Sequence, residues 1–238
     1  MANFVRYKKL FRLYEFIQPH LKYSLPVEKE LPGKKVLVIA PHPDDETIGC
    51  GGTIYKHINS GGSAEVLYCT LDSDIRFKEA MNAASVIGFS NKHFLKYQVE
   101  SLAKQHNLAD KFYSLFKKID PDIVFVPFWF DNHTDHRAVN SALRKVAKRK
   151  TFNFMIYSYP VWFPLYPNVL IDIGDVWEKK KEAIQCYPSQ LATRDYVKMS
   201  HSLGQYWAEV KGRGLEVVES FFRASFSEYV SLGKKMGI

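Results

Sequence analysis

The sequence has few cysteines and no long apolar run. Its three cysteines, at positions 50, 69 and 186, include no Cys-x-x-Cys pair, so neither a disulfide framework nor a thiolate zinc site is indicated. The longest apolar runs, residues 36–40 and 123–130, are far shorter than the roughly 18 to 20 residues that a membrane-spanning helix needs. Charges interrupt the N-terminus before a signal-peptide core can form. We therefore expect a cytoplasmic protein.

Acidic residues are fewer than basic ones. The 238 residues include 33 Lys and Arg against 25 Asp and Glu, which gives a net charge of +8. This excess favours anionic partners such as nucleic acid, a membrane surface or a phosphorylated substrate. The basic residues fall in several separate places without a recognisable nucleic-acid module, so we expect no nucleic-acid partner. With 46% hydrophobic and 24% charged residues, the composition is typical of a globular protein and not of a disordered one.

An N-terminal segment is set apart by Pro26, Pro32 and Gly33. Within it, apolar side chains recur at helical spacing, while the basic side chains lie largely off that stripe. The pattern predicts a basic amphipathic helix, which either packs against the parent domain or a second subunit, or makes peripheral contact with an anionic membrane. We therefore expect an extension over residues 1–33 and a single domain over residues 34–238.

From Lys35 onward, short apolar runs alternate with helical patterns. Apolar runs at residues 36–40, 64–70 and 123–126 predict strands, with helices between them. Crossovers between parallel strands place helices on both faces of a sheet, so this rhythm predicts an α/β fold, a Rossmann-like three-layer sandwich with a mainly parallel sheet. The remaining expected elements are strands at residues 94–97, 154–158 and 169–173, and helices at residues 76–87, 102–118, 136–148 and 176–186.

Two polar clusters follow predicted strands. One is the segment Ala-Pro-His-Pro-Asp-Asp-Glu at residues 40–46, and the other is Asp-Asn-His-Thr-Asp-His at residues 131–136. Parallel strands end at one edge of a sheet, so the two clusters are expected to meet there. A single cluster of this kind is compatible with a solvated turn, but two, each after a strand, favour a shared site. Imidazole with carboxylate and no thiolate suits catalytic zinc or a related divalent ion.

Glycines follow the first cluster, in the segment Gly-Cys-Gly-Gly-Thr at residues 49–53. They suggest a phosphate-cradling turn, with Asp72 in the place of a ribose-binding acid. The G-x-G-G spacing departs from the dinucleotide fingerprint, however. Close packing of a helix behind a metal-binding loop explains the same glycines.

At these residues the sequence resembles the PIG-L/LmbE family of zinc-dependent N-acetylglucosaminyl deacetylases. The family pattern of a strand, (A/P)-H-P-D-D-E and G-x-G-G-T is met by residues 40–53, and its H-x-D-H motif by residues 133–136. Further likeness lies in Arg76 with Glu79 and in the lysine-alanine helix that begins at Lys180 and ends in Ser-Gln. The resemblance therefore covers roughly residues 35–190.

The resemblance implies a metal centre and a base. Matched by position, His42, Asp45 and His136 would bind Zn²⁺, with another divalent metal as the alternative. Asp44 would be the general base, which takes a proton from the metal-activated water before that water attacks an acetamide carbonyl.

Three further roles follow from the same resemblance. His133 would stabilise the oxyanion or protonate the leaving amine, and a cationic His133 would suit that role. Asp135 would orient a neighbouring imidazole, and Arg76 would contact the substrate.

The expected activity is removal of an N-acetyl group from an amino sugar or sugar conjugate. The sequence does not distinguish a free sugar from one attached to a nucleotide or a lipid. One alternative is an amidase for another small amide, such as a thiol conjugate. Another is a non-catalytic metal- or sugar-binding module, which would have no need of the spare carboxylate of Asp44. A homo-oligomer is compatible with the sequence.

Two features depart from the family pattern. Tyr187 stands where the family often has histidine before the Pro-Ser-Gln segment. The aromatic stretch at residues 157–166, which includes Trp162, has no matching family role. Aromatic faces either stack on sugar rings or fill cores, and both interpretations stay open here.

Overall fold

The computed structural model describes residue 16 and residues 25–212 and 214–236. All of the predicted N-terminal amphipathic helix except residue 16 lies outside these residues, so it stays a prediction, as do the domain boundary at residue 33 and the proposed membrane contact. Among the described residues, no helix combines the length and apolar character that crossing a bilayer requires.

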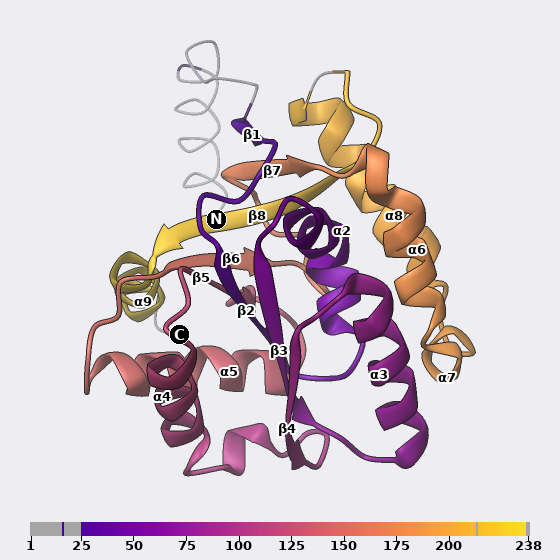
Figure 1. The fold of residues 1–238 in the computed structure, drawn as a ribbon. Helices are drawn as coiled ribbons and strands as arrows, with labels where there is room; N and C mark the ends of the chain where they lie inside the picture. Colours follow the sequence, from indigo (N-terminus) through magenta and orange to yellow (C-terminus); the bar gives the residue numbers. More distant parts are fainter. Residues whose placement is uncertain (1–15, 17–24, 213, 237–238) are drawn as a thin grey trace, which may run out of the picture.

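A mixed sheet of eight strands forms the middle layer, in the order β1-β7-β8-β6-β5-β2-β3-β4 (Figure 1). Neighbours pair in parallel except at β8, which runs antiparallel to both β6 and β7. The predicted mainly parallel sheet is therefore confirmed. The strands are β1 (Val27–Glu28), β2 (Lys35–Ala40), β3 (Ser63–Thr70), β4 (Asn91–Tyr97), β5 (Ile123–Pro127), β6 (Met155–Tyr159), β7 (Val169–Asp172) and β8 (Val218–Ser225).

Helices cover both faces of this sheet, as the three-layer prediction requires (Figure 1). The first face carries α2 (Asp45–Asn59), α3 (Asp74–Ile87), α6 (Trp177–Gln185), α7 (Pro188–Leu191) and α8 (Tyr196–Trp207). The second face carries α4 (Leu108–Ile119), α5 (Thr134–Ala147) and α9 (Phe226–Lys235). The remaining short elements are the 3₁₀ turns η2 (Leu102–Lys104) and η3 (Gly174–Val176) and the π turn η4 (Ala208–Gly212).

The sequence pattern explains the central strands. Each residue of β5 is buried, because helices cover both faces of a central parallel strand and both its side-chain rows are therefore apolar. β2 is buried at all but its first residue for the same reason. α4 instead places apolar side chains on one face, with Phe112 and Phe116 in the core between α4 and the sheet.

The carboxyl ends of the central strands lie at one edge of the sheet. β2 pairs in parallel with both β3 and β5, so the segments that follow these three strands emerge side by side. The loop after β4 and the segment after β6 leave the sheet in the same direction. This edge therefore gathers both polar clusters.

Candidate active site

The two polar clusters meet because the strands that precede them are neighbours. β2 and β5 pair with Val36 opposite Ile123, and both lead out of the sheet at the same edge. His42 follows β2, and His136 lies in the first turn of α5. The two histidines are 94 residues apart in the sequence, yet Nδ1 of His42 lies 3.3 Å from Nε2 of His136.

The three predicted metal ligands converge on one point. Oδ2 of Asp45 lies 3.1 Å from Nδ1 of His42 and 3.1 Å from Nε2 of His136. With the 3.3 Å between the two nitrogens, the three atoms form a nearly equilateral triangle. A tetrahedral zinc ion with ligands about 2.0–2.1 Å away separates neighbouring ligand atoms by about 3.3 Å. The donor set and its spacing therefore fit such an ion.

A second layer of carboxylates holds the two imidazoles. Oδ2 of Asp135 lies 3.0 Å from Nε2 of His42, and Asp135 also accepts backbone N–H bonds from the loop at residues 100–102. Oδ2 of Asp131 lies 3.2 Å from Nδ1 of His136, an ion-pair distance without hydrogen-bond geometry. Each carboxylate faces the ring nitrogen opposite the one in the triangle, the usual support of metal-binding histidines.

These carboxylates set the protonation of the site. Burial lowers the pKa of both histidines, but their carboxylate partners raise the pKa of His42 to about 9 and that of His136 to about 10. Burial raises the pKa of Asp45, but the two histidines outweigh it and hold that pKa well below its usual range. A metal ion at this point would therefore replace protons on the two imidazoles.

Asp44 has a strained backbone beside the ligand triangle. Its φ of 122° is rare for a residue other than glycine, and such strain persists only where the surroundings enforce it. Its backbone N–H donates to Oε2 of Glu46 at 3.0 Å, and its carbonyl accepts from Oγ1 of Thr47 at 2.7 Å. Burial and the charge of Asp45 raise the pKa of the Asp44 carboxyl well above its usual value. Its carboxylate is therefore a stronger base than that of an ordinary aspartate.

Glu46 is held by two tyrosines from distant elements. Its Oε1 accepts a hydrogen bond of 2.5 Å from Tyr187 and one of 3.2 Å from Tyr68, and all three residues are buried. Burial raises the pKa of Glu46 to about 7, against the lowering effect of the Tyr187 hydrogen bond. Tyr187, the departure from the family pattern, therefore anchors the glutamate that holds the Asp44 backbone.

His133 lies beside the triangle, and one of its ring nitrogens already accepts a hydrogen bond. Its Nδ1 accepts the backbone N–H of Asp135 at 3.1 Å, which leaves the ring proton on Nε2 in the neutral form. Burial and the positive charges of His42 and His136 lower the pKa of His133. The neutral ring is therefore favoured over the expected cation. A ring nitrogen of His133 also lies within 4.8 Å of ligand atoms of the other two histidines.

The site opens into a pocket of about 200 Å³. Arg76 lines it, with Nη2 3.5 Å from Oδ2 of Asp44 and with a buried Nε that has no hydrogen-bond partner among the described residues. Trp162 lines it as well, and the guanidinium of Arg194 lies 4.7 Å from the centre of that indole ring. Further lining residues are Asp72, Val99, Gln190 and Tyr196.

Sequence reasoning left three of these residues without a role. Asp131 stood in the second cluster, but which imidazole it faces depends on how that segment folds. Glu46 belonged to the first motif, yet its tyrosine partners are distant in the sequence. Trp162 belongs to the aromatic stretch at residues 157–166. It lines the pocket, whereas Tyr157 and Tyr159 of the same stretch fill the core.

The glycine-rich segment at residues 49–53 lies inside α2 and not in a phosphate-binding turn. The backbone N–H groups of Gly52 and Thr53 donate to the carboxylate of Glu219 at 3.0 and 2.8 Å. Lys180 pairs with the same carboxylate at 2.5 Å, and both side chains are 3% exposed. The protein's own carboxylate therefore occupies the N–H groups that a phosphate would need, so the helix-packing explanation is the right one.

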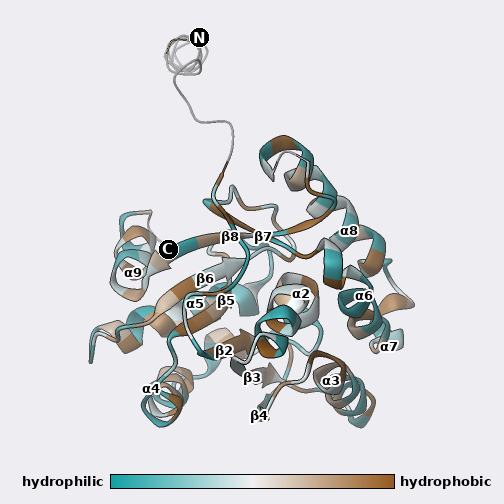
Figure 2. Ribbon diagram, turned by 45° about the horizontal axis from the view of Figure 1, so that its top comes forward, coloured by the Kyte–Doolittle hydropathy of each residue, from teal (hydrophilic) through white to brown (hydrophobic). Residues whose placement is uncertain are grey.

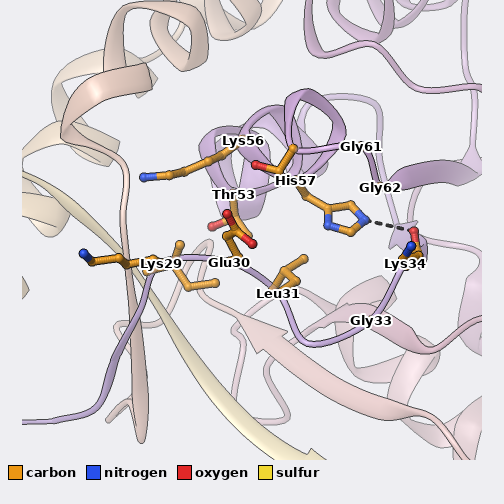
Figure 3. A pocket seen from close by; sticks show the side chains of 12 residues that line it. Lys29, Glu30, Leu31, Gly33, Lys34, Thr53, Lys56, His57, Gly61 and Gly62 are labelled. Atoms are coloured by element: carbon orange, nitrogen blue, oxygen red, sulfur yellow. Dashed lines mark hydrogen bonds between the residues drawn. The ribbon is translucent and has the colours of Figure 1, made fainter.

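A second hollow, of about 150 Å³, lies at the other end of α2 (Figure 3). Nε2 of His57 lies 3.1 Å from the Lys34 carbonyl, whereas the ammonium groups of Lys29 and Lys56 point away from His57. The metal-binding end of the same 15-residue helix is about 20 Å away. This hollow therefore has no part in the metal site.

Comparisons with known proteins find similarity to deacetylases over this region. A family model described as PIG-L, GlcNAc-PI de-N-acetylase, matches residues 37–147, which include both polar clusters. Diacetylchitobiose deacetylase from Thermococcus kodakarensis is 29% identical over 189 residues, which are 66% of this chain and 70% of that protein. A probable N-acetyl-alpha-D-glucosaminyl L-malate deacetylase 2 from Bacillus anthracis is 25% identical, over 68% of this chain and 83% of that protein.

The fold has a similar counterpart among solved structures. A conserved protein from Thermus thermophilus superposes with a TM-score of 0.70 at 26% sequence identity. The superposition covers 79% of this chain and 93% of that chain. The likeness therefore extends well beyond the two clusters.

Proposed function

We propose that this protein is a zinc-dependent N-deacetylase acting on an N-acetylated amino sugar, since a PIG-L family model matches residues 37–147. The observation that carries the proposal is the triangle of His42 Nδ1, Asp45 Oδ2 and His136 Nε2, with Asp44 next to it in the sequence and in the pocket. Both relatives reported above support the substrate class, since their names describe deacetylases of a chitobiose and of a glucosaminyl malate.

His42, Asp45 and His136 would hold the metal. A divalent ion bound there polarises the acetamide carbonyl and lowers the pKa of a water molecule. Asp135 and Asp131 keep the two imidazoles turned so that their other nitrogens face one point. Nitrogen and oxygen ligands without thiolate at this spacing favour zinc.

Asp44 would take the proton of the attacking water, since its carboxylate stands outside the ligand triangle and Glu46 fixes its backbone. Nε2–H of His133 would donate to the oxyanion that develops on the acetamide oxygen. The proton held by Asp44 is then available to the leaving nitrogen as the C–N bond breaks. The products are acetate and the free amine, so protons balance over the reaction.

The pocket limits how much of the substrate enters. Its volume of about 200 Å³ is below the roughly 300–1,000 Å³ of pockets that enclose a drug-sized ligand. One acetamido-sugar ring would therefore enter, against Trp162 and Arg76, while a nucleotide or lipid carrier would stay outside.

The test is release of primary amine from a panel of free, nucleotide-linked and lipid-linked N-acetyl sugars. We expect release from at least one sugar with zinc present and loss of release with a chelator, restored by added zinc. No release from any sugar by protein that holds stoichiometric zinc would contradict the proposal. Release from a thiol-conjugate amide alone would replace deacetylation of sugars with the amidase alternative.

A further inference from the structure

A strained turn over residues 98–101 joins β4 to η2. β4 is an edge strand of the sheet, and the chain leaves it to reach α4 on the second face (Figures 1 and 2). The turn closes where Ser101 donates to the carbonyl of Gln98, from its backbone N–H at 3.2 Å and from its hydroxyl at 2.6 Å. Its third residue, Glu100, has a φ of 62°. A turn with a positive φ at this position normally has glycine there, because a Cβ is disfavoured.

The main chain of this turn binds one buried carboxylate. The N–H of Glu100 donates to Oδ2 of Asp135 at 2.6 Å, and the N–H of Leu102 donates to Oδ1 at 2.9 Å. Asp135 is fully buried, and the Leu102 side chain lies in the core of the second face. The Glu100 side chain is exposed, so its packing does not enforce the strained backbone. The contacts that accompany the strain are therefore those of the backbone N–H groups.

Asp135 connects the turn to one of the predicted metal ligands. The same Oδ2 that accepts from Glu100 lies 3.0 Å from Nε2 of His42. Nδ1 of that imidazole is one corner of the ligand triangle. Because the turn holds both oxygens of Asp135, this carboxylate cannot rotate without loss of a backbone hydrogen bond. The direction in which His42 faces the metal position thus depends on a loop distant in the sequence.

We propose that the 98–101 turn, together with the N–H of Leu102, is a positioning element of the metal centre. The left-handed backbone of Glu100 is retained because it directs that N–H at Asp135. The inference rests on the metal centre of the proposed function. A turn that only connected β4 to α4 would affect stability but not the properties of a bound metal, and this difference makes the two roles separable.

Glu100→Pro and Glu100→Gly form a matched pair that tests this role. Both remove the same exposed side chain, but proline lacks the N–H and fixes φ near −65°, whereas glycine keeps the N–H and accepts a positive φ. We expect zinc affinity, measured by competition with a chelator, to fall by about tenfold or more in Glu100→Pro. Glu100→Gly should stay within about twofold of the unaltered chain. The visible spectrum of the cobalt-substituted protein reports ligand geometry and should shift in the proline variant alone.

A second comparison tests whether the turn acts through Asp135. In an Asp135→Ala background, Glu100→Pro should lower zinc affinity by less than about twofold further, because the connection to His42 is already lost. Fully additive losses would overturn the proposal. If Glu100→Pro does not fold, Leu102→Pro against Leu102→Ala makes the same comparison at the second N–H donor.

Urea denaturation of the metal-free variants separates positioning from stability. A fall in unfolding free energy in Glu100→Pro, with zinc affinity and the cobalt spectrum unchanged, would overturn the proposed role of the turn and leave the metal centre intact. Equal losses of zinc affinity in the proline and glycine variants would overturn it as well. Absence of zinc binding by the unaltered chain would instead overturn the metal centre and this inference together.

Discussion

Asp44 and Asp45 are adjacent in the sequence, but their side chains lie in different environments because the backbone changes direction where α2 begins. Asp45 begins α2, and its carboxylate lies between His42 and His136, which lower its pKa. Asp44 precedes the helix with a φ of 122°, and its burial raises its pKa. Neighbouring carboxyls whose pKa values move apart are suited to different tasks, here those of ligand and base.

Asp44→Asn tests this division of roles. The amide keeps the size of the side chain but cannot accept a proton, so we expect turnover to fall by roughly 10²–10⁴-fold. Zinc content, measured by atomic absorption, should remain at one equivalent or close to it, because Asp44 lies outside the ligand triangle. Full activity in this variant would disprove the assignment of Asp44 as the base.

Tyr187→Phe tests whether Glu46 positions Asp44. Removal of the 2.5 Å hydrogen bond frees Glu46 on one side, so we expect a several-fold fall in kcat with KM and zinc content unchanged. Tyr159→Phe is the matched control, because its hydroxyl is equally buried but bonds to the Ile39 carbonyl. Each substitution should cost about 1 kcal/mol of unfolding free energy. Equal kcat values in the two variants would show that Tyr187 acts on stability alone.

At the scale of elements, α2 links the metal site to β8 and to α6, which lies on the same face of the sheet. Its first turn supplies Asp45, and its middle is tied to β8 and α6 through Glu219 and Lys180. Gly49 lets the helix lie against Tyr159, since a Cβ there would come within 2.2 Å of that ring. The orientation of the metal-binding turn thus depends on contacts along the whole helix.

Lys180→Met tests the buried ion pair behind α2. Loss of the ammonium leaves the Glu219 carboxylate buried with backbone N–H partners only, so we expect a loss of about 3–5 kcal/mol in unfolding free energy. Urea denaturation measures it. The double variant with Glu219→Leu removes both charges and should recover at least half of the loss. If the double variant lost as much unfolding free energy as Lys180→Met and Glu219→Leu lose in sum, that result would contradict the pairing.

At the scale of the whole molecule, the sequence predicts best what local patterns encode. β2, β3 and β5 each contain an apolar run, so their positions and their parallel arrangement follow from periodicity and crossover rules. The meeting of the two clusters follows as well, because strands of a parallel sheet end at one edge.

Features that depend on distant contacts could not be predicted. β8 contains Glu219 and Arg223 among apolar residues, which hides its strand pattern, and its antiparallel pairing with β6 and β7 depends on the completed sheet. Asp131 and Trp162 acquire their places only when the segment after β6 folds over the second cluster. Local sequence patterns do not predict these contacts, because they join residues that are distant in the sequence.

The most direct test of the metal centre is the zinc affinity of single-histidine variants, measured by competition with a chromophoric chelator. His136→Ala removes one corner of the triangle, so we expect its affinity to fall by about 100-fold or more relative to the unaltered chain. His133→Ala, at the N-cap of the same helix, should bind zinc within a few-fold of the unaltered protein. Full zinc affinity in His136→Ala, or an equal loss in His133→Ala, would contradict a centre formed by His42, Asp45 and His136.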